Sequence, residues 1–162
     1  MNILRPTSRR FALGAAAAVL ATTGAVGGLA APALAAGTCV DQFTGAARTV
    51  TLTGTSGNDT LTVTTSNTVV DALEGVDVVR VGPGLTGVAI CLGDGADTVT
   101  GNGGLPNQPL SVMGGPGNDS ITSGSGSDAL NGGAGTDFID AGGGSDTCKN
   151  VETAVSCEFI QS

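Results

Sequence analysis

Apolar residues recur along this chain at intervals of nine. Between residues 45 and 149 the eighth residue of every nine is apolar, with two interruptions, the pair Ile90-Cys91 and the irregular piece 101–113. The neighbours of these apolar residues are mostly polar or small, which predicts short strands that point one side chain into a core. The predicted inward positions are Leu52, Leu61, Val70, Val79, Val88, Val99, Ile121, Leu130, Ile139 and Cys148.

Glycine occupies the remaining fixed positions. The segments 114–122, 123–131, 132–140 and 141–149 each carry glycine at positions two and four and aspartate at position six. Glycine suits tight corners, which need positive φ and close approach of backbones. One apolar residue in nine cannot bury a core alone, so successive coils must stack about 4.8 Å apart. The sequence therefore predicts an all-β fold, a right-handed parallel β-roll of about eleven nine-residue turns, with two turns in each full coil.

The repeated pattern G-G-x-G-x-D-x-U-x, in which U is apolar, resembles the RTX or haemolysin-type calcium-binding repeat family. The resemblance implies that Ca²⁺ lies between the glycine-rich corners, held by carboxylates and backbone carbonyls. Its metal ligands would be Asp59, Asp77, Asp97, Asp119, Asp128, Asp137 and Asp146. The carbonyls would come from near Gly57, Gly75, Gly95, Gly115, Gly117, Gly124, Gly126, Gly133, Gly135, Gly142 and Gly144.

Because two nonapeptides make one coil, the sixth positions fall alternately on two sides of the roll. One side carries aspartate throughout, and the other carries Val50, Thr68 and Thr86 before Asp128 and Asp146. We expect about five calcium ions, about four between neighbouring corners of the first side and one on the second. This count assumes that both interruptions are absorbed in corners. The alternative is a calcium-free solenoid whose aspartates only cap turns. Turn capping is also the favoured role of Asn58, Asp94, Asn118 and Asp140, with secondary calcium ligation as the alternative.

Composition excludes several classes of function. The chain has no histidine, tryptophan or tyrosine, which removes histidine-dependent catalysis and histidine zinc sites. All fourteen acidic residues lie beyond residue 40, with only Arg48, Arg80 and Lys149 to oppose them. Such a surface repels nucleic acid and anionic lipid. We expect a calcium-binding protein that is not an enzyme, with no nucleic-acid partner, no small-molecule substrate and no membrane contact in the mature form.

Residues 1–35 have the features of a secretory signal peptide. Arg5, Arg9 and Arg10 precede a long apolar stretch, and Ala33-Leu34-Ala35 fits a cleavage site. We expect a secreted bacterial protein that is cleaved near Ala35. The pair Arg9-Arg10 leaves the twin-arginine route open beside the general one, and an uncleaved membrane anchor is the remaining alternative.

Four cysteines in an exported chain of this size indicate two disulfides. Cys148 and Cys157 are close in sequence and form the natural pair, which leaves Cys39 with Cys91. That second bond requires segment 36–48 to run back along the roll, because a disulfide joins Cα atoms at most about 7 Å apart. The expected organisation is an N-terminal cap and first turn (36–53), the roll (54–149) and a disulfide-stapled C-terminal cap (150–162). In that cap Val151, Val155 and Phe159 would cover the open end of the core.

The sequence thus indicates a secreted calcium-binding roll whose folding is coupled to the ion. A surface or matrix adhesion protein, or a spacer in which calcium is only structural, is the alternative. Neither the biological role nor a protein partner can be inferred from the residues.

Overall fold

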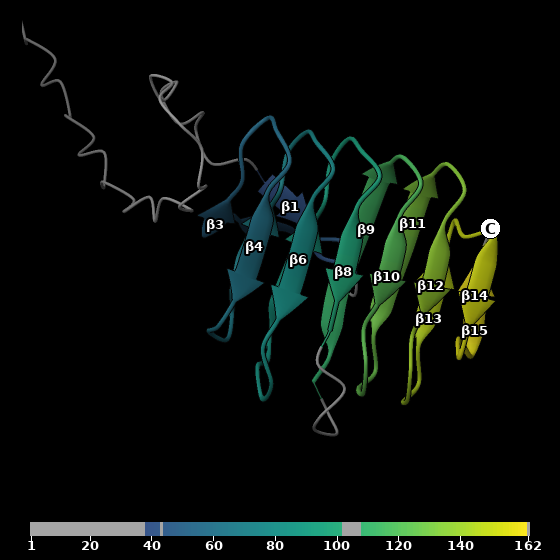
Figure 1. The fold of residues 1–162 in the computed structure, drawn as a ribbon. Helices are drawn as coiled ribbons and strands as arrows, with labels where there is room; N and C mark the ends of the chain where they lie inside the picture. Colours follow the sequence, from purple (N-terminus) through teal and green to yellow (C-terminus); the bar gives the residue numbers. More distant parts are fainter. Residues whose placement is uncertain (1–37, 43, 102–107, 162) are drawn as a thin grey trace, which may run out of the picture.

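The chain folds into two parallel β-sheets that face each other across a narrow core (Figure 1). The computed structural model describes residues 38–42, 44–101 and 108–161. The predicted signal peptide, 1–35, lies outside these residues. In the described part of the chain, no helix is long and apolar enough to span a membrane.

Each sheet takes alternate strands of the chain. The six-stranded sheet contains β4 (Thr60–Val63), β6 (Val78–Val81), β8 (Thr98–Thr100), β10 (Ser120–Thr122), β12 (Phe138–Asp140) and β14 (Thr153–Val155). The seven-stranded sheet contains β3 (Leu52–Thr53), β5 (Val69–Asp71), β7 (Val88–Cys91), β9 (Leu110–Pro116), β11 (Ala129–Ala134), β13 (Thr147–Lys149) and β15 (Phe159–Gln161). A separate antiparallel hairpin is formed by β1 (Thr38–Val40) and β2 (Ala47–Thr49).

The parallel β-solenoid class predicted from the nine-residue period is confirmed. Leu52 pairs with Val70, and Ile121 pairs with Ile139, so one coil spans two nonapeptides. The expected number of about eleven turns was too high as a count of full turns, because two nonapeptides make one coil and the solenoid has about 5 full turns.

The first interruption was predicted at the wrong place. Val70 pairs with Ile90, so Ile90 occupies a regular inward position instead of being an extra residue. The Gly82 N–H still bonds to the Val63 carbonyl as in an uninterrupted coil, and the Asn67 N–H bonds to the Thr86 carbonyl. The two additional residues therefore lie in the corner between Gly82 and Thr86. A shift of two residues keeps each side chain on the same face of a strand, so the apolar alternation could not reveal the difference.

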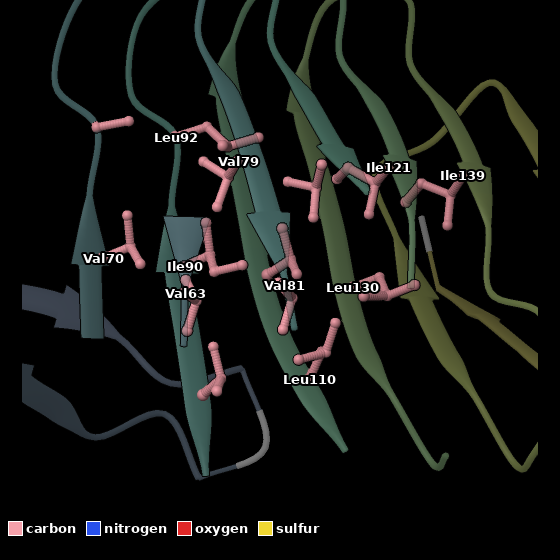
Figure 2. Close-up of a cluster of buried hydrophobic side chains, with 14 of the residues drawn as sticks. Val63, Val70, Val79, Val81, Ile90, Leu92, Leu110, Ile121, Leu130 and Ile139 are labelled. Atoms are coloured by element: carbon pink, nitrogen blue, oxygen red, sulfur yellow. The ribbon is translucent and has the colours of Figure 1, made fainter. Parts of the chain in front are cut away.

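Apolar side chains from the two sheets meet in a single ladder (Figure 2). Nine of the ten predicted inward residues are buried, and the tenth, Leu52, packs partly buried against the ladder. Additional buried residues come from the strand position two residues further on or from the longer strands β7 and β9. These are Val63, Ala72, Val81, Ile90, Leu92, Leu110, Val112 and Ala141.

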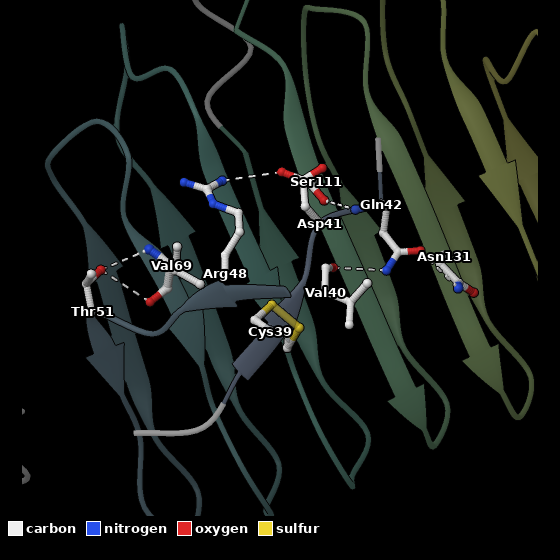
Figure 3. The surroundings of a disulfide bond; sticks show 10 residues. Cys39, Val40, Asp41, Gln42, Arg48, Thr51, Val69, Ser111 and Asn131 are labelled. Carbon is white, nitrogen blue, oxygen red and sulfur yellow. Dashed lines mark hydrogen bonds and ion pairs between the residues drawn. A yellow bond between two sulfur atoms is a disulfide. The ribbon is translucent and has the colours of Figure 1, made fainter. Parts of the chain in front are cut away.

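The hairpin β1–β2 lies on the outer face of the seven-stranded sheet (Figure 3). Cys39 in the hairpin is bonded to Cys91 in β7, with Cα atoms 5.7 Å apart. Around this disulfide, Val69 and Ala89 form a second, smaller apolar cluster on the side of the sheet that faces away from the main core. The Gln42 N–H extends the contact by donating to the Ser111 hydroxyl in β9, at 2.6 Å. The segment after Cys39 thus runs along several coils of the roll.

The C-terminal tail continues both sheets for one more, shortened coil. Cys148 and Cys157 are bonded, with Cα atoms 6.0 Å apart, and Val151 packs against the core. The expectation that Val155 and Phe159 cover the core was wrong, because they are 45% and 60% exposed. They lie in β14 and β15 beside Asp140 and Thr147, where their side chains point away from the inward positions.

The corners are built from stacked glycines. Gly95, Gly117 and Gly135 all have φ near +150°, which side chains rarely adopt. A Cβ atom added to Gly117 would collide with the Gly95 carbonyl oxygen in the preceding coil. Gly143 also lies in a corner, but a Cβ atom there would meet nothing within 4 Å.

We predict that Gly117→Ala destabilises the folded chain by about 2–4 kcal/mol, because both the φ angle and the backbone contact oppose a side chain. Gly143→Ala is the control and should change stability by less than about 0.5 kcal/mol. Urea unfolding in the presence of calcium measures both. Equal effects of the two substitutions would show that the corners are not closely stacked.

Candidate metal centre

Every strand of the six-stranded sheet begins directly after a residue with a carboxylate side chain. Five of these residues are aspartates, which stand at the sixth position of their repeats and form the first row of corners: Asp59, Asp77, Asp97, Asp119 and Asp137. A second row precedes strands of the seven-stranded sheet and contains Asp128 before β11 and Asp146 before β13. The two interruptions of the period do not shift any aspartate to the other side.

Every aspartate except Asp59 ties its corner to the preceding coil. The Asp59 N–H donates to Oδ1 of Asp77 at 2.8 Å, and the same bond recurs along the first row at 2.7, 3.0 and 2.9 Å. In the second row the Leu110 N–H donates to Asp128 and the Asp128 N–H donates to Asp146, at 2.8 and 2.7 Å. These bonds form two carboxylate ladders that run parallel to the strand pairing.

The second oxygen of every one of these carboxylates is buried without a hydrogen-bond partner. It is Oδ1 in Asp59 and Oδ2 in the other six aspartates. All seven side chains belong to residues at most 3% exposed. A buried anionic oxygen without a partner costs several kcal/mol of stability unless a proton or a cation compensates it. The rows therefore have the character of cation sites.

Burial raises the pKa of several of these carboxyl groups. The pKa of Asp77 and of Asp119 rises to about 6, mainly through desolvation and further through the charges of neighbouring aspartates in the row. Desolvation also raises the pKa of the carboxyl groups of Asp97, Asp128 and Asp146. Without a cation, the folded roll thus resists full ionisation of its own ladders.

Backbone carbonyl oxygens lie close to the carboxylate groups of these aspartates. A Cβ atom added at Gly114 would collide with Oδ2 of Asp119 and with the carbonyl oxygen of Gly132 in the next coil. At Gly54 it would meet the Asp59 carboxylate and the Ala72 carbonyl. In the described residues, no three acidic or thiol side chains come together around one point. An ion in these corners would consequently take most of its ligands from carbonyls, a donor set of hard oxygens that suits Ca²⁺.

The glycines predicted to supply carbonyl ligands lie between strands, except Gly115 and Gly133, which lie near the ends of β9 and β11. Position-four glycines also link the corners, since the N–H of Gly75, Gly95 and Gly117 donates to a carbonyl in the following coil at 2.7 to 2.9 Å. The second row has no aspartate in the first coils, where Val50 and Thr68 occupy the equivalent positions. Thr68 uses its hydroxyl for a bond to the Thr65 carbonyl at 2.8 Å, and Val50 packs beside the hairpin.

Three functional residues were missed from the sequence. The Thr55 N–H and hydroxyl both bond to Oδ2 of Asp59, at 2.5 and 2.9 Å, and so cap the first ladder. Glu152 and Glu158 cap the other ends, because each accepts an N–H from the last aspartate of its row at 2.7 Å. The shortened spacing of the last coil hid both glutamates from a nine-residue frame. Their position directly before the triplets 153–155 and 159–161, whose central residues Ala154 and Ile160 are apolar, was the available signal.

Of the four corner residues Asn58, Asp94, Asn118 and Asp140, two bond across coils and one makes a local turn bond. Asn58 and Asn118 accept the N–H groups of Val76 and Thr136 in the next coil, both at 2.9 Å. Asp140 accepts the Gly142 N–H at 3.1 Å.

Comparison with known proteins points to the same chemistry. The model of the RTX calcium-binding nonapeptide repeat matches the chain in four copies, over residues 51–84 and 113–148. No curated protein and no solved structure shows significant similarity to the chain. The corner that contains Asp97 lies outside the matched residues, yet its hydrogen bonds to both neighbouring aspartates are those of the matched corners.

We predict that β structure in metal-free buffer increases as the pH falls from about 7.5 to about 5. The folded-state pKa of Asp77 and Asp119, about 6, lies above the unfolded value near 3.9, so the folded state binds more protons in this window. The contribution of these two groups to stability is fully present below their unfolded pKa and is lost as the pH rises through about 6. Far-UV circular dichroism follows the change. The variant Asp77→Asn/Asp119→Asn should weaken the pH dependence of the β signal, whereas Asp94→Asn, at an exposed residue, should leave it unchanged. A wild-type β signal that does not increase as the pH falls would contradict the raised pKa of these two carboxyl groups.

Proposed function

Since this chain belongs to the RTX calcium-binding nonapeptide repeat family, we propose that it is a secreted calcium-binding protein whose folding is coupled to the ion. The observation that carries the proposal is the set of seven buried carboxylate oxygens without hydrogen-bond partners. They lie in rows at the glycine corners, where backbone carbonyls also converge. Calcium is the cation whose preference for many oxygen ligands fits this set.

The coupling of folding to calcium follows from where the charges lie. In the unfolded chain the aspartates are hydrated and far apart, whereas in the roll they are desolvated and adjacent. The apolar ladder is narrow and offers limited stabilisation against chain entropy. A ligand that binds only the folded state stabilises it in proportion to its concentration. Calcium would therefore shift the chain from a disordered to a folded state.

We assign no catalytic role to the ladders. Six of the seven carboxylates are committed through one oxygen to a backbone N–H of the preceding coil, Asp59 accepts from Thr55 in its own corner, and the second oxygen of each is buried. The repetition of one geometry along the roll suits multiple binding of the same ion. We expect about five ions from the aspartate pairs alone.

Secretion is supported by the cysteine chemistry and by the N-terminal residues. Both disulfides join segments that the roll brings together, and such bonds persist in oxidising compartments. Arg5, Arg9 and Arg10 before an apolar stretch and a small-residue site have the features of an export signal. Extracellular calcium modules bind in the range of about 10⁻⁴ to 10⁻³ M, which sets the affinity we expect.

We predict that calcium converts the oxidised mature chain from coil to β structure at pH 7.5, because the ions neutralise the ladders. A calcium titration followed by far-UV circular dichroism measures the transition, with magnesium as the comparison ion. Magnesium should fail, since it demands small octahedral sites and dehydrates reluctantly.

The variant Asp119→Asn/Asp137→Asn tests the ladder directly. It preserves size but removes two charges, and should raise the calcium midpoint about tenfold or more. Asp94→Asn/Asp140→Asn removes the same charge from the corner residues outside the ladders and should leave the midpoint nearly unchanged. A chain already folded in chelator and indifferent to calcium would refute the proposal and favour a spacer or adhesive role.

We also predict that the exported chain starts near Ala36, which intact-mass analysis of protein from the culture medium can determine. Arg9→Lys/Arg10→Lys separates the two export routes, because only the twin-arginine route should fail with this substitution. Retention of the full chain in the membrane fraction would instead support the anchor alternative.

A further inference from the structure

We propose that Glu152 and Glu158 form, with the last aspartate of each row, a terminal pair of calcium sites outside the nonapeptide repeats. The proposal rests on the calcium-binding function proposed above and adds a site to each row. It concerns the shortened coil at the C-terminal end of the roll, around β14 and β15 (Figure 1). No nonapeptide match covers this coil, since the last matched residue is 148.

The last coil repeats the spacing of the regular corner with different residues, although the backbone φ values differ from those of the corner glycines. Asn150 and Ser156 have φ of 45° and 57°, left-handed values that favour glycine. Each stands two residues before a glutamate, and each glutamate directly precedes a strand, β14 or β15. Gly135 and Asp137 have the same spacing before β12. The tail is therefore a contracted form of the regular corner.

The glutamates also make the bond that defines the ladders. Oε2 of Glu152 accepts the Asp137 N–H, and Oε2 of Glu158 accepts the Asp146 N–H, both at 2.7 Å. In the regular coils the bonded residues are eighteen positions apart, but here they are fifteen and twelve apart. Each glutamate thus accepts the N–H that the aspartate of the following coil accepts elsewhere in the roll. The sequence separation is smaller because the last coil has fewer corner residues.

Oxygen ligands converge at the terminal corner as they do inside the roll. A Cβ atom added at Gly132 would collide with the Asp137 carboxylate and with the Asn150 carbonyl oxygen. The inner corner at Gly114 presents the corresponding pair, Asp119 and the Gly132 carbonyl. Oδ2 of Asp137 is buried and unpartnered, and the residue is 1% exposed. The Asn150 carbonyl of the last coil therefore corresponds to the Gly132 carbonyl of the inner corner.

A simple hydrogen-bond cap does not account for this arrangement. A cap needs only an acceptor for the last N–H, which Oε2 provides. The buried oxygens of Asp137 and Asp146 would remain without partners beneath that cap. Asp146 is fully buried next to a second anionic group, the exposed Glu158, and a cation between them would compensate the buried oxygen of Asp146. The terminal glutamates therefore have a ligand role in addition to the bond.

The experiment counts bound calcium ions by native mass spectrometry of the oxidised mature chain. The ladders contain seven carboxylate-to-carboxylate steps, five in the first row and two in the second, and two of these steps involve glutamate. We expect Glu152→Gln and Glu158→Gln each to lose one ion relative to the wild type. Glutamine keeps an acceptor oxygen for the N–H bond and removes only the charge.

Glu74→Gln is the matched control, because Glu74 is exposed and is the only other glutamate of the chain. Unchanged ion counts in both ladder variants would overturn the terminal sites, and so would an equal loss in the control. A wild-type chain that binds no calcium at all would instead refute the proposed function itself. The two failures are therefore distinguishable.

A measurement on the wild type tests the terminal sites without any substitution, so its result does not depend on whether the variants fold. With ¹³C-labelled glutamate the chain gives three side-chain carboxyl signals. In calcium the signals of Glu152 and Glu158 should move away from the value of a solvated carboxylate, whereas the Glu74 signal should keep it. Three signals at the solvated value in the calcium-bound chain would refute the terminal sites.

Discussion

The rest of the structure depends on a carboxylate that is bonded through one oxygen and unpartnered through the other. The bonded oxygen holds the N–H of the preceding corner and so helps to set the spacing of the coils. The unpartnered oxygen places negative charge in a buried row. The same side chain therefore positions neighbouring coils through its hydrogen bond and destabilises the folded state through its buried charge. A bound cation would neutralise the charge and leave the hydrogen bond in place. The calcium dependence that we propose is in this sense a consequence of the architecture.

The glycine content follows from the same constraint. Backbone carbonyls can face the carboxylates only if no side chain fills the corner, and successive corners approach so closely that a Cβ atom at Gly117 or Gly135 would meet a carbonyl. The chain therefore gives up the apolar contacts that corner side chains would make. The lost packing makes the roll more dependent on ions and on its two disulfides.

The repeat period was sufficient to predict the solenoid, the inward residues and the alignment of the aspartates. It was insufficient where spacing changes. The two residues inserted before Thr86 preserved the alternation, so Val88 and Ile90 were equally good inward candidates. Glu152 and Glu158 were missed because contraction of the last coil removes them from the frame. The position of the hairpin on the sheet depends on contacts such as Gln42 with Ser111, which join residues distant in sequence and leave no periodic signal.

The sources of stability differ between the two halves of the roll. Near the N-terminus the strands contribute second inward residues of good size, such as Val63, Val81 and Leu92, and the disulfide-linked hairpin covers the outer face. Near the C-terminus the corresponding position holds Ser123 or Ala141, while both rows carry carboxylates. Apolar burial thus decreases along the chain as the density of buried charge increases. Under the proposed coupling of folding to calcium, we therefore expect the C-terminal half to depend on the ion more strongly than the N-terminal half.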